Sequence, residues 1–133
     1  MENVLVKVLL KKALAEYDMI YEEYCRPHRD MVMMAECDMI KDAISLLLKA
    51  YLQEKGIVDT TSNDIEELLG KCKTFDENFA ELNLSPIVEL DAESRMARNL
   101  ALEDGLLIEC LKTLQQSKQM ILTKLGVSEL SLS

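Results

Sequence analysis

The stretch from Met31 to Gly56 has the clearest helical pattern of apolar and polar positions in the chain. Its apolar residues recur in steps of three or four, which places them on one helix face: Met34, Cys37, Ile40, Ile44, Leu47, Leu48 and Tyr51. Gly56 stands where helices commonly end in a left-handed residue. The pattern predicts a long central helix whose apolar positions are dense enough to contact more than one neighbour.

An earlier helix is predicted from about Asn3 to Tyr24, where apolar residues again form one stripe. The pair Arg26–Pro27 is expected to end it, because proline disfavours a helical conformation in the residue before it. The connection to the central helix is then short, so the two helices should be antiparallel neighbours. Four acidic residues of this helix are expected to face outward: Glu16, Asp18, Glu22 and Glu23.

The segment after the central helix predicts short helices and turns. Start signals occur at Thr61–Asp64 and again at Thr74–Glu77, where a hydroxyl residue precedes a carboxylate by three positions. Gly70 is expected to limit the first short helix to about two turns. Ser85 before Pro86 is typical of an N-cap followed by proline at the first helical position.

Long helical spacing returns from about Asp91 to Gly126, with Gly105 as the point where this helix could kink or divide. Four glycines and two prolines leave little turn chemistry for a many-stranded fold. The 133 residues, 49% of them hydrophobic, suffice for one buried core. We therefore predict one all-α domain over residues 1–133, an up-down bundle of four main helices with short helices inserted before the last.

The chain is acidic, with a formal net charge of −9. Such a field repels phosphate, which disfavours nucleic-acid binding and anionic membranes. Between Asp59 and Asp91 the sequence contains nine carboxylates and only two lysines. This segment is either a solvated face or a docking surface for a basic partner. The candidate docking residues are Asp64, Glu66, Glu67, Asp76, Glu77 and Glu81.

No residue pattern predicts a metal or cofactor. The four cysteines (Cys25, Cys37, Cys72 and Cys110) contain no CxxC pair, and the single His28 has no ligand partners at a matching spacing. They are expected to be free thiols and a turn residue in a cytoplasmic protein. The apolar run at the N-terminus is interrupted by lysines and lacks a cleavage site, so it does not resemble a signal peptide. No apolar stretch reaches the roughly 18–20 residues that span a bilayer.

Two segments resemble HEPN domains, a small all-α bacterial and archaeal family often encoded beside minimal nucleotidyltransferases. They are Leu47-Leu48-Lys49-Ala50-Tyr51-Leu52-Gln53-Glu54-Lys55-Gly56 and Asn63-Asp64-Ile65-Glu66-Glu67-Leu68-Leu69. The resemblance implies a helical bundle that forms homodimers. An excess of apolar residues over what one bundle can cover also favours homodimerisation through the long helices.

The ribonuclease members of that family carry an arginine, a polar residue and then a histidine near the start of the last long helix. Arg98 and Asn99 match this motif, but Glu103 stands at the histidine position. A carboxylate repels the scissile phosphate and lacks the near-neutral pKa of imidazole. The alternative for Arg98, and the one we favour, is an ion pair with Asp91, Glu103 or a neighbouring helix.

Three functional hypotheses follow. The first is a non-catalytic, homodimeric HEPN-like interaction module that binds a nucleotidyltransferase-type or other protein through its acidic middle segment. The second is a divergent, toxin-like HEPN ribonuclease that uses Arg98 and Asn99 with an unrecognised acid–base group. The third is a bundle that holds a small hydrophobic ligand among its methionines, which no specific residue favours.

Overall fold

The computed structural model describes residues 4–24, 33–57, 64–89 and 104–128. Every regular element in these ranges is helical, and none of them contains a strand, which confirms the all-α prediction. The elements are α1 (Val4–Tyr24), α2 (Met33–Glu54), α3 (Ile65–Phe75), the 3₁₀ helix η1 (Glu77–Glu81), a short helix over residues 85–89, and α5 (Asp104–Leu125).

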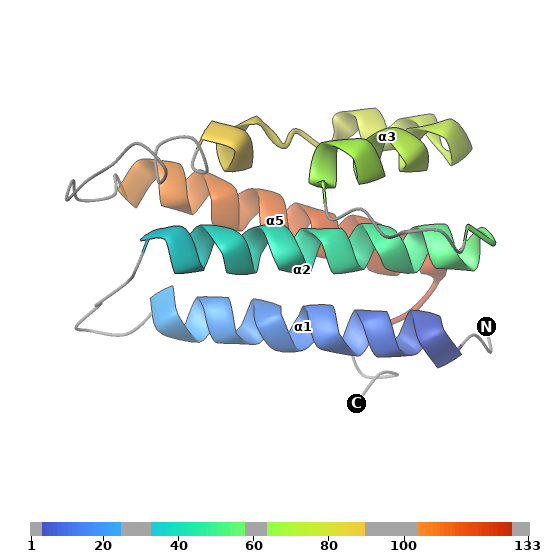
Figure 1. Ribbon diagram of the computed structural model, residues 1–133, viewed down its shortest axis with the longest axis horizontal. Helices are drawn as coiled ribbons and strands as arrows, with labels where there is room; N and C mark the ends of the chain where they lie inside the picture. Colours follow the sequence, from blue (N-terminus) through green and yellow to red (C-terminus); the bar gives the residue numbers. More distant parts are fainter. Residues whose placement is uncertain (1–3, 25–32, 58–63, 90–103, 129–133) are drawn as a thin grey trace.

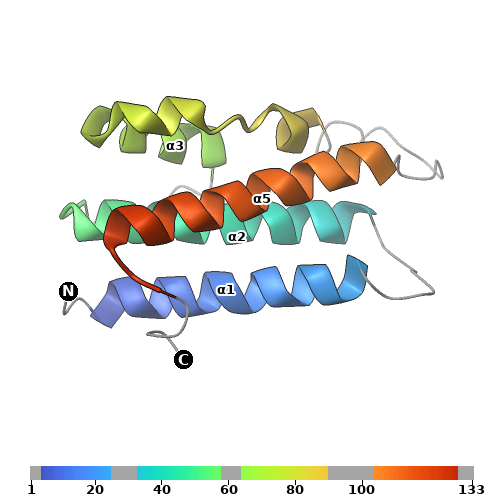
Figure 2. The same cartoon turned by 180° about the vertical axis from the view of Figure 1, so that it is seen from behind.

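The helices form three layers (Figures 1 and 2). α2 and α5 lie side by side in the middle layer, with α1 on one side and α3, η1 and residues 85–89 on the other. α1 and α2 run antiparallel, as expected, and α5 runs in the direction of α2. α3 also runs in the direction of α2, whereas η1 and the residues after it run back, so residues 85–89 lie near the end of the bundle where α5 begins (Figures 1 and 2).

The predicted apolar faces of the long helices supply the core. Ile40, Ile44, Leu47, Leu48 and Tyr51 of α2 are all buried, and α2 contacts α1, α3 and α5. From α1 and α5 the buried residues are Val6, Leu10, Ala13, Ile20, Cys110, Leu111, Leu114, Ile121 and Leu122. The central helix therefore packs on more than one neighbour, as its apolar density predicts.

α1 is also tied to α5 by polar and aromatic contacts. The hydroxyl of Tyr21 donates a hydrogen bond to the carbonyl oxygen of Leu111 at 3.3 Å. The ring of Tyr17 lies 4.7 Å from that of Tyr21, and Nζ of Lys118 lies 3.9 Å from the centroid of the Tyr17 ring. These contacts fix one side of α1 against the bundle.

Glu16 differs from its predicted outward position. It is partly buried, and its Oε2 is buried without a hydrogen-bond partner in the part of the chain that the structure describes. Its carboxyl makes a side-chain hydrogen bond with Asp42 of α2. Burial, together with this hydrogen bond and the charge of Asp42, raises the pKa of Glu16 to about 7.

The helix starts in the middle segment differ from the predictions by a few residues. Asp64 is itself the N-cap of α3, whereas Thr61 lies outside the described residues. Asp76, and not Thr74, caps η1. The carbonyl oxygen of Leu84 already accepts hydrogen bonds from the next turn, so the last short helix starts one residue earlier than the Ser85–Pro86 signal predicts. At α3 and η1 the caps are aspartates, whose carboxylate oxygens accept hydrogen bonds from the free amides of the first turn.

Gly105 lies in the first turn of α5, and the helix continues unbroken to Leu125. The expected start near Asp91 lies outside the described residues.

Gly70 does not end α3, which continues to Phe75. A Cβ at Gly70 would meet nothing within 4 Å. We expect Gly70→Ala to raise the free energy of unfolding by about 0.5–1 kcal/mol, because alanine restricts the unfolded chain and favours the helix. Urea denaturation measures the change.

The matched control is Gly56→Ala. Gly56 also has open space around its Cα, but its φ of +86° is unfavourable for a residue with a side chain. The same substitution should therefore destabilise by about 1 kcal/mol. Equal effects of the two substitutions would contradict this account of Gly70.

Candidate protein-docking surface

α3 turns its carboxylates outward because its apolar residues fix the opposite face. The buried residues recur at helical spacing: Ile65, Leu68, Leu69 and Cys72. Oδ1 of Asp64 accepts hydrogen bonds from the backbone N–H groups of Glu66 and Glu67, at 3.0 and 3.4 Å. Both glutamates are exposed in the first turn, where negative charge complements the helix dipole. Oε1 of Glu67 lies 3.8 Å from Nζ of Lys71, one turn further along.

η1 carries two further exposed carboxylates, Glu77 and Glu81, and Glu81 lines a separate hollow against α5. Asp76 has a different role. Its Oδ1 accepts a hydrogen bond from the backbone N–H of Asn78 at 2.9 Å, and its Oδ2 accepts one from Nζ of Lys124 at 2.6 Å. The Lys124 hydrogen bond, followed by that of Asn78, holds the pKa of Asp76 below its usual value. Asp76 thus joins η1 to the end of α5.

A cluster of aromatic rings and lysines supports η1 from beneath. Phe79 is fully buried and meets the ring of Tyr51 edge-on, with 4.8 Å between centroids. Nζ of Lys124 lies 5.1 Å from the Phe79 centroid, and Nζ of Lys55 lies 5.4 Å from that of Tyr51. Burial, and then the charge of Asp76, raises the pKa of Tyr51. η1 is therefore held against both α2 and α5.

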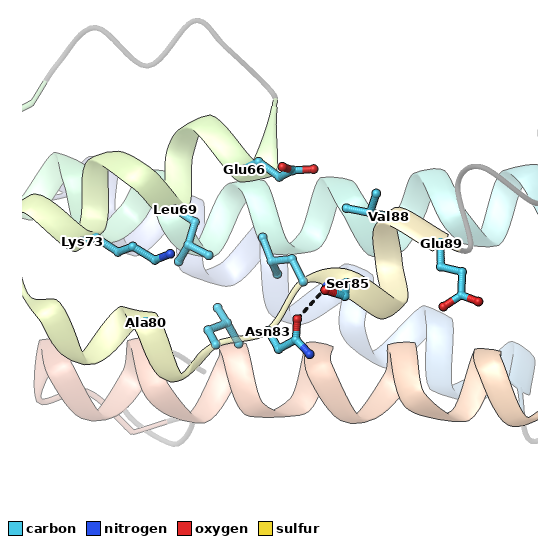
Figure 3. A pocket seen from close by; sticks show the side chains of 10 residues that line it. Glu66, Leu69, Lys73, Ala80, Asn83, Ser85, Val88 and Glu89 are labelled. Atoms are coloured by element: carbon cyan, nitrogen blue, oxygen red, sulfur yellow. Dashed lines mark hydrogen bonds between the residues drawn. The ribbon is translucent and has the colours of Figure 1, made fainter.

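A hollow of about 660 Å³ lies between α3 and residues 80–89 (Figure 3). Its apolar lining consists of Val88, which is 43% exposed, and three buried leucines: Leu69, Leu82 and Leu84. The remaining lining residues are Glu66, Lys73, Ala80, Asn83, Ser85 and Glu89.

The side of the hollow opposite α3 is fixed by a local hydrogen bond. Oδ1 of Asn83 accepts from the backbone N–H of Ser85 at 3.0 Å, which holds the extended stretch before the last short helix (Figure 3). The hollow therefore offers apolar surface bordered by charged side chains. Such a site can take an apolar side chain while charged groups at its edge select the neighbouring residues.

The candidate catalytic residues Arg98, Asn99 and Glu103 lie outside the described residues, and so does His28. The catalytic role of Arg98 and its alternative, an ion pair with a nearby carboxylate, both stay as sequence predictions.

Within the described ranges, no group of three or more histidine, cysteine or acidic side chains could hold a metal ion. Cys72 and Cys110 are buried and belong to no disulfide, as expected, while Cys25 and the side chain of Cys37 lie outside what the structure describes. Burial raises the pKa of the Cys72 thiol to about 12, so it is a poor nucleophile. None of the helices described here has the length and apolar content that crossing a membrane requires.

Two parts of the site were not found from the sequence. Lys124 is 48 positions from Asp76, and no local pattern links them. No sequence pattern links the leucines of the hollow either, because Leu69 and Leu84 come from separate elements. The exposed carboxylates themselves were found by counting charge.

Comparison of the chain with protein-family models, with curated proteins and with solved structures gives no match. The resemblance to HEPN domains therefore rests on the sequence segments alone.

Proposed function

We propose that this chain is a non-catalytic interaction module that binds a basic protein segment. The binding site is the α3–η1 acidic surface, by which we mean Asp64, Glu66, Glu67, Glu77 and Glu81 with the adjoining hollow. The observation that supports the proposal is the placement of exposed carboxylates beside an apolar depression. Asp76 is not included, because its carboxylate is engaged with Lys124.

The partner's chemistry follows from these surroundings. An apolar side chain of the partner would cover Leu69 and Val88, while flanking lysines or arginines would meet Glu66 and Glu89, the two carboxylates that line the hollow. The exposed Glu77 and Glu81 of η1 add further negative charge for a basic segment to meet. Lys73 is the one basic residue among those lining the hollow, so it disfavours a basic group directly above it. Charge complementarity of this kind steers association and selects partners.

A nucleotidyltransferase-type protein is the partner that the resemblance to HEPN domains implies. The alternative function is a divergent ribonuclease that uses Arg98 and Asn99. No observation on the described residues favours it, but it has a direct test.

Binding can be tested with a peptide probe. Its central leucine is flanked by lysines, and a second peptide carries glutamates instead. We expect the lysine peptide to bind and to shift amide NMR signals of α3, η1 and residues 82–89. The triple variant Glu66→Lys, Glu77→Lys, Glu81→Lys should weaken binding by about tenfold or more.

The matched control reverses three exposed carboxylates elsewhere: Asp38→Lys, Glu54→Lys and Glu109→Lys. It changes the net charge equally and should bind within about twofold of wild type. Equal losses in both variants would show that only the overall charge matters. RNA cleavage by the purified protein that disappears in Arg98→Ala would replace the proposal with the ribonuclease alternative.

A further inference from the structure

The outer side of α1 exposes apolar side chains that the core does not use. Val4, Val8 and Met19 are 73%, 52% and 55% exposed, and Ala15 between them is exposed as well. Their spacing of four, seven and four residues places them on one face of the helix. A surface helix ordinarily presents polar residues there.

The opposite face of α1 already supplies what the fold needs. Val6, Leu10, Ala13 and Ile20 are buried against the bundle. Both ribbon views also place α1 on the side of the bundle away from α3 (Figures 1 and 2). The exposed stripe is therefore a second apolar face, distant from the α3–η1 acidic surface.

The charges beside the stripe are divided between the two halves of the helix. Lys7, Lys11 and Lys12 are exposed in the first half, and Asp18 and Glu22 are exposed in the second. If two copies of α1 lie antiparallel, the lysines of each copy face the carboxylates of the other. In a parallel pair, like charges would face each other and repel.

We propose that α1 is a self-association face, through which two copies of this chain form an antiparallel, two-fold symmetric dimer. The stripe supplies the apolar contact, and the divided charges make the face complementary to itself, as a two-fold interface requires. A uniformly basic or uniformly acidic partner would be repelled by one half of the helix. A second copy satisfies both halves.

The charge on the rest of the molecule also favours a second copy of this chain as the partner that covers α1. At a net charge of −9, two copies repel each other over most of their surfaces. α1 is an exception, because its three lysines nearly balance its carboxylates. The proposal is independent of the proposed function, since a dimer through α1 leaves both α3–η1 acidic surfaces on the outside.

Two charge variants of the full chain test the proposal. The first, Lys7→Glu with Lys11→Glu, leaves more carboxylates than lysines in both halves of α1. The second, Asp18→Lys with Glu22→Lys, places lysines at the exposed charged positions of both halves. Analytical ultracentrifugation from about 1 to about 200 µM should show dimers for wild type and roughly tenfold or greater weakening for each variant alone. An equimolar mixture of the two should form a heterodimer, because opposite charges then meet along the helix.

The matched control exchanges a charged pair on α5, Glu109→Lys with Lys112→Glu, and should dimerise as wild type does. A third variant, Val8→Glu with Met19→Glu, tests the apolar stripe and should be monomeric. Circular dichroism melting confirms that each variant is folded. A wild-type monomer at the highest concentration, charge variants that dimerise unchanged, or folded variants that fail to associate on mixing would each overturn the proposal.

Discussion

Replacing Phe79 with alanine is expected to lower the free energy of unfolding by about 3–5 kcal/mol. The ring is fully buried, packs edge-on against Tyr51 and lies beneath Nζ of Lys124. Its removal leaves a cavity where η1 meets α2 and α5, next to the hydrogen bond that ties Asp76 to Lys124. Urea denaturation, monitored by circular dichroism, measures the loss.

Phe75→Ala provides the control, because Phe75 and Phe79 are the only two phenylalanines in the chain. Phe75 is 46% exposed at the end of α3, so its truncation should cost less than about 1 kcal/mol. Equal costs for the two substitutions would mean that η1 contributes little to the fold. The α3–η1 acidic surface would then lack the rigid support that the cluster beneath it provides.

The long helices and their buried faces could be predicted from the sequence because helical periodicity is a local property. Ile40, Ile44 and Leu47 are spaced by the helix repeat itself, and their burial requires only that some neighbour covers them. The all-α class, the helical hairpin and the central position of α2 follow from that pattern.

The length of α3 could not be predicted from Gly70 alone. Glycine inside a helix costs about 1 kcal/mol relative to alanine, and the sequence prediction gave that cost decisive weight. In the structure, the burial of Cys72 beyond Gly70 outweighs it, because only a continued helix places Sγ of Cys72 3.8 Å from the carbonyl oxygen of Leu48 on α2.

The candidate site could be predicted only as far as charge and composition reach. Counting carboxylates along the sequence identified Glu66 and Glu77, and both side chains are exposed in the structure. Counting could not distinguish Asp76, whose partner Lys124 comes close only when α5 returns along the bundle. The hollow likewise depends on bringing Leu69 beside residues that follow η1.

The carboxyl pair between α1 and α2 should make stability depend on pH. Folding raises the pKa of Glu16 from 4.5 to about 7, because of burial and of the hydrogen bond and charge of Asp42, while Lys12 partly opposes the change. A carboxyl whose pKa is raised in the folded state contributes stability that is fully present below pH 4.5 and is lost as the pH rises through about 7. Above that pH, two carboxylates face each other across the α1–α2 contact.

Glu16→Gln keeps a hydrogen-bond donor toward Asp42 and removes the charge. We expect this variant to gain about 1 kcal/mol relative to wild type between about pH 5 and about pH 8, a value reduced because water reaches and screens this partly exposed carboxyl. Urea denaturation at the two pH values measures it. Glu22→Gln, an exposed site on the same helix, should change stability equally at both. If Glu16→Gln also shows no difference between them, Glu16 is ionised throughout, and the two helices must then accommodate both charges at their contact.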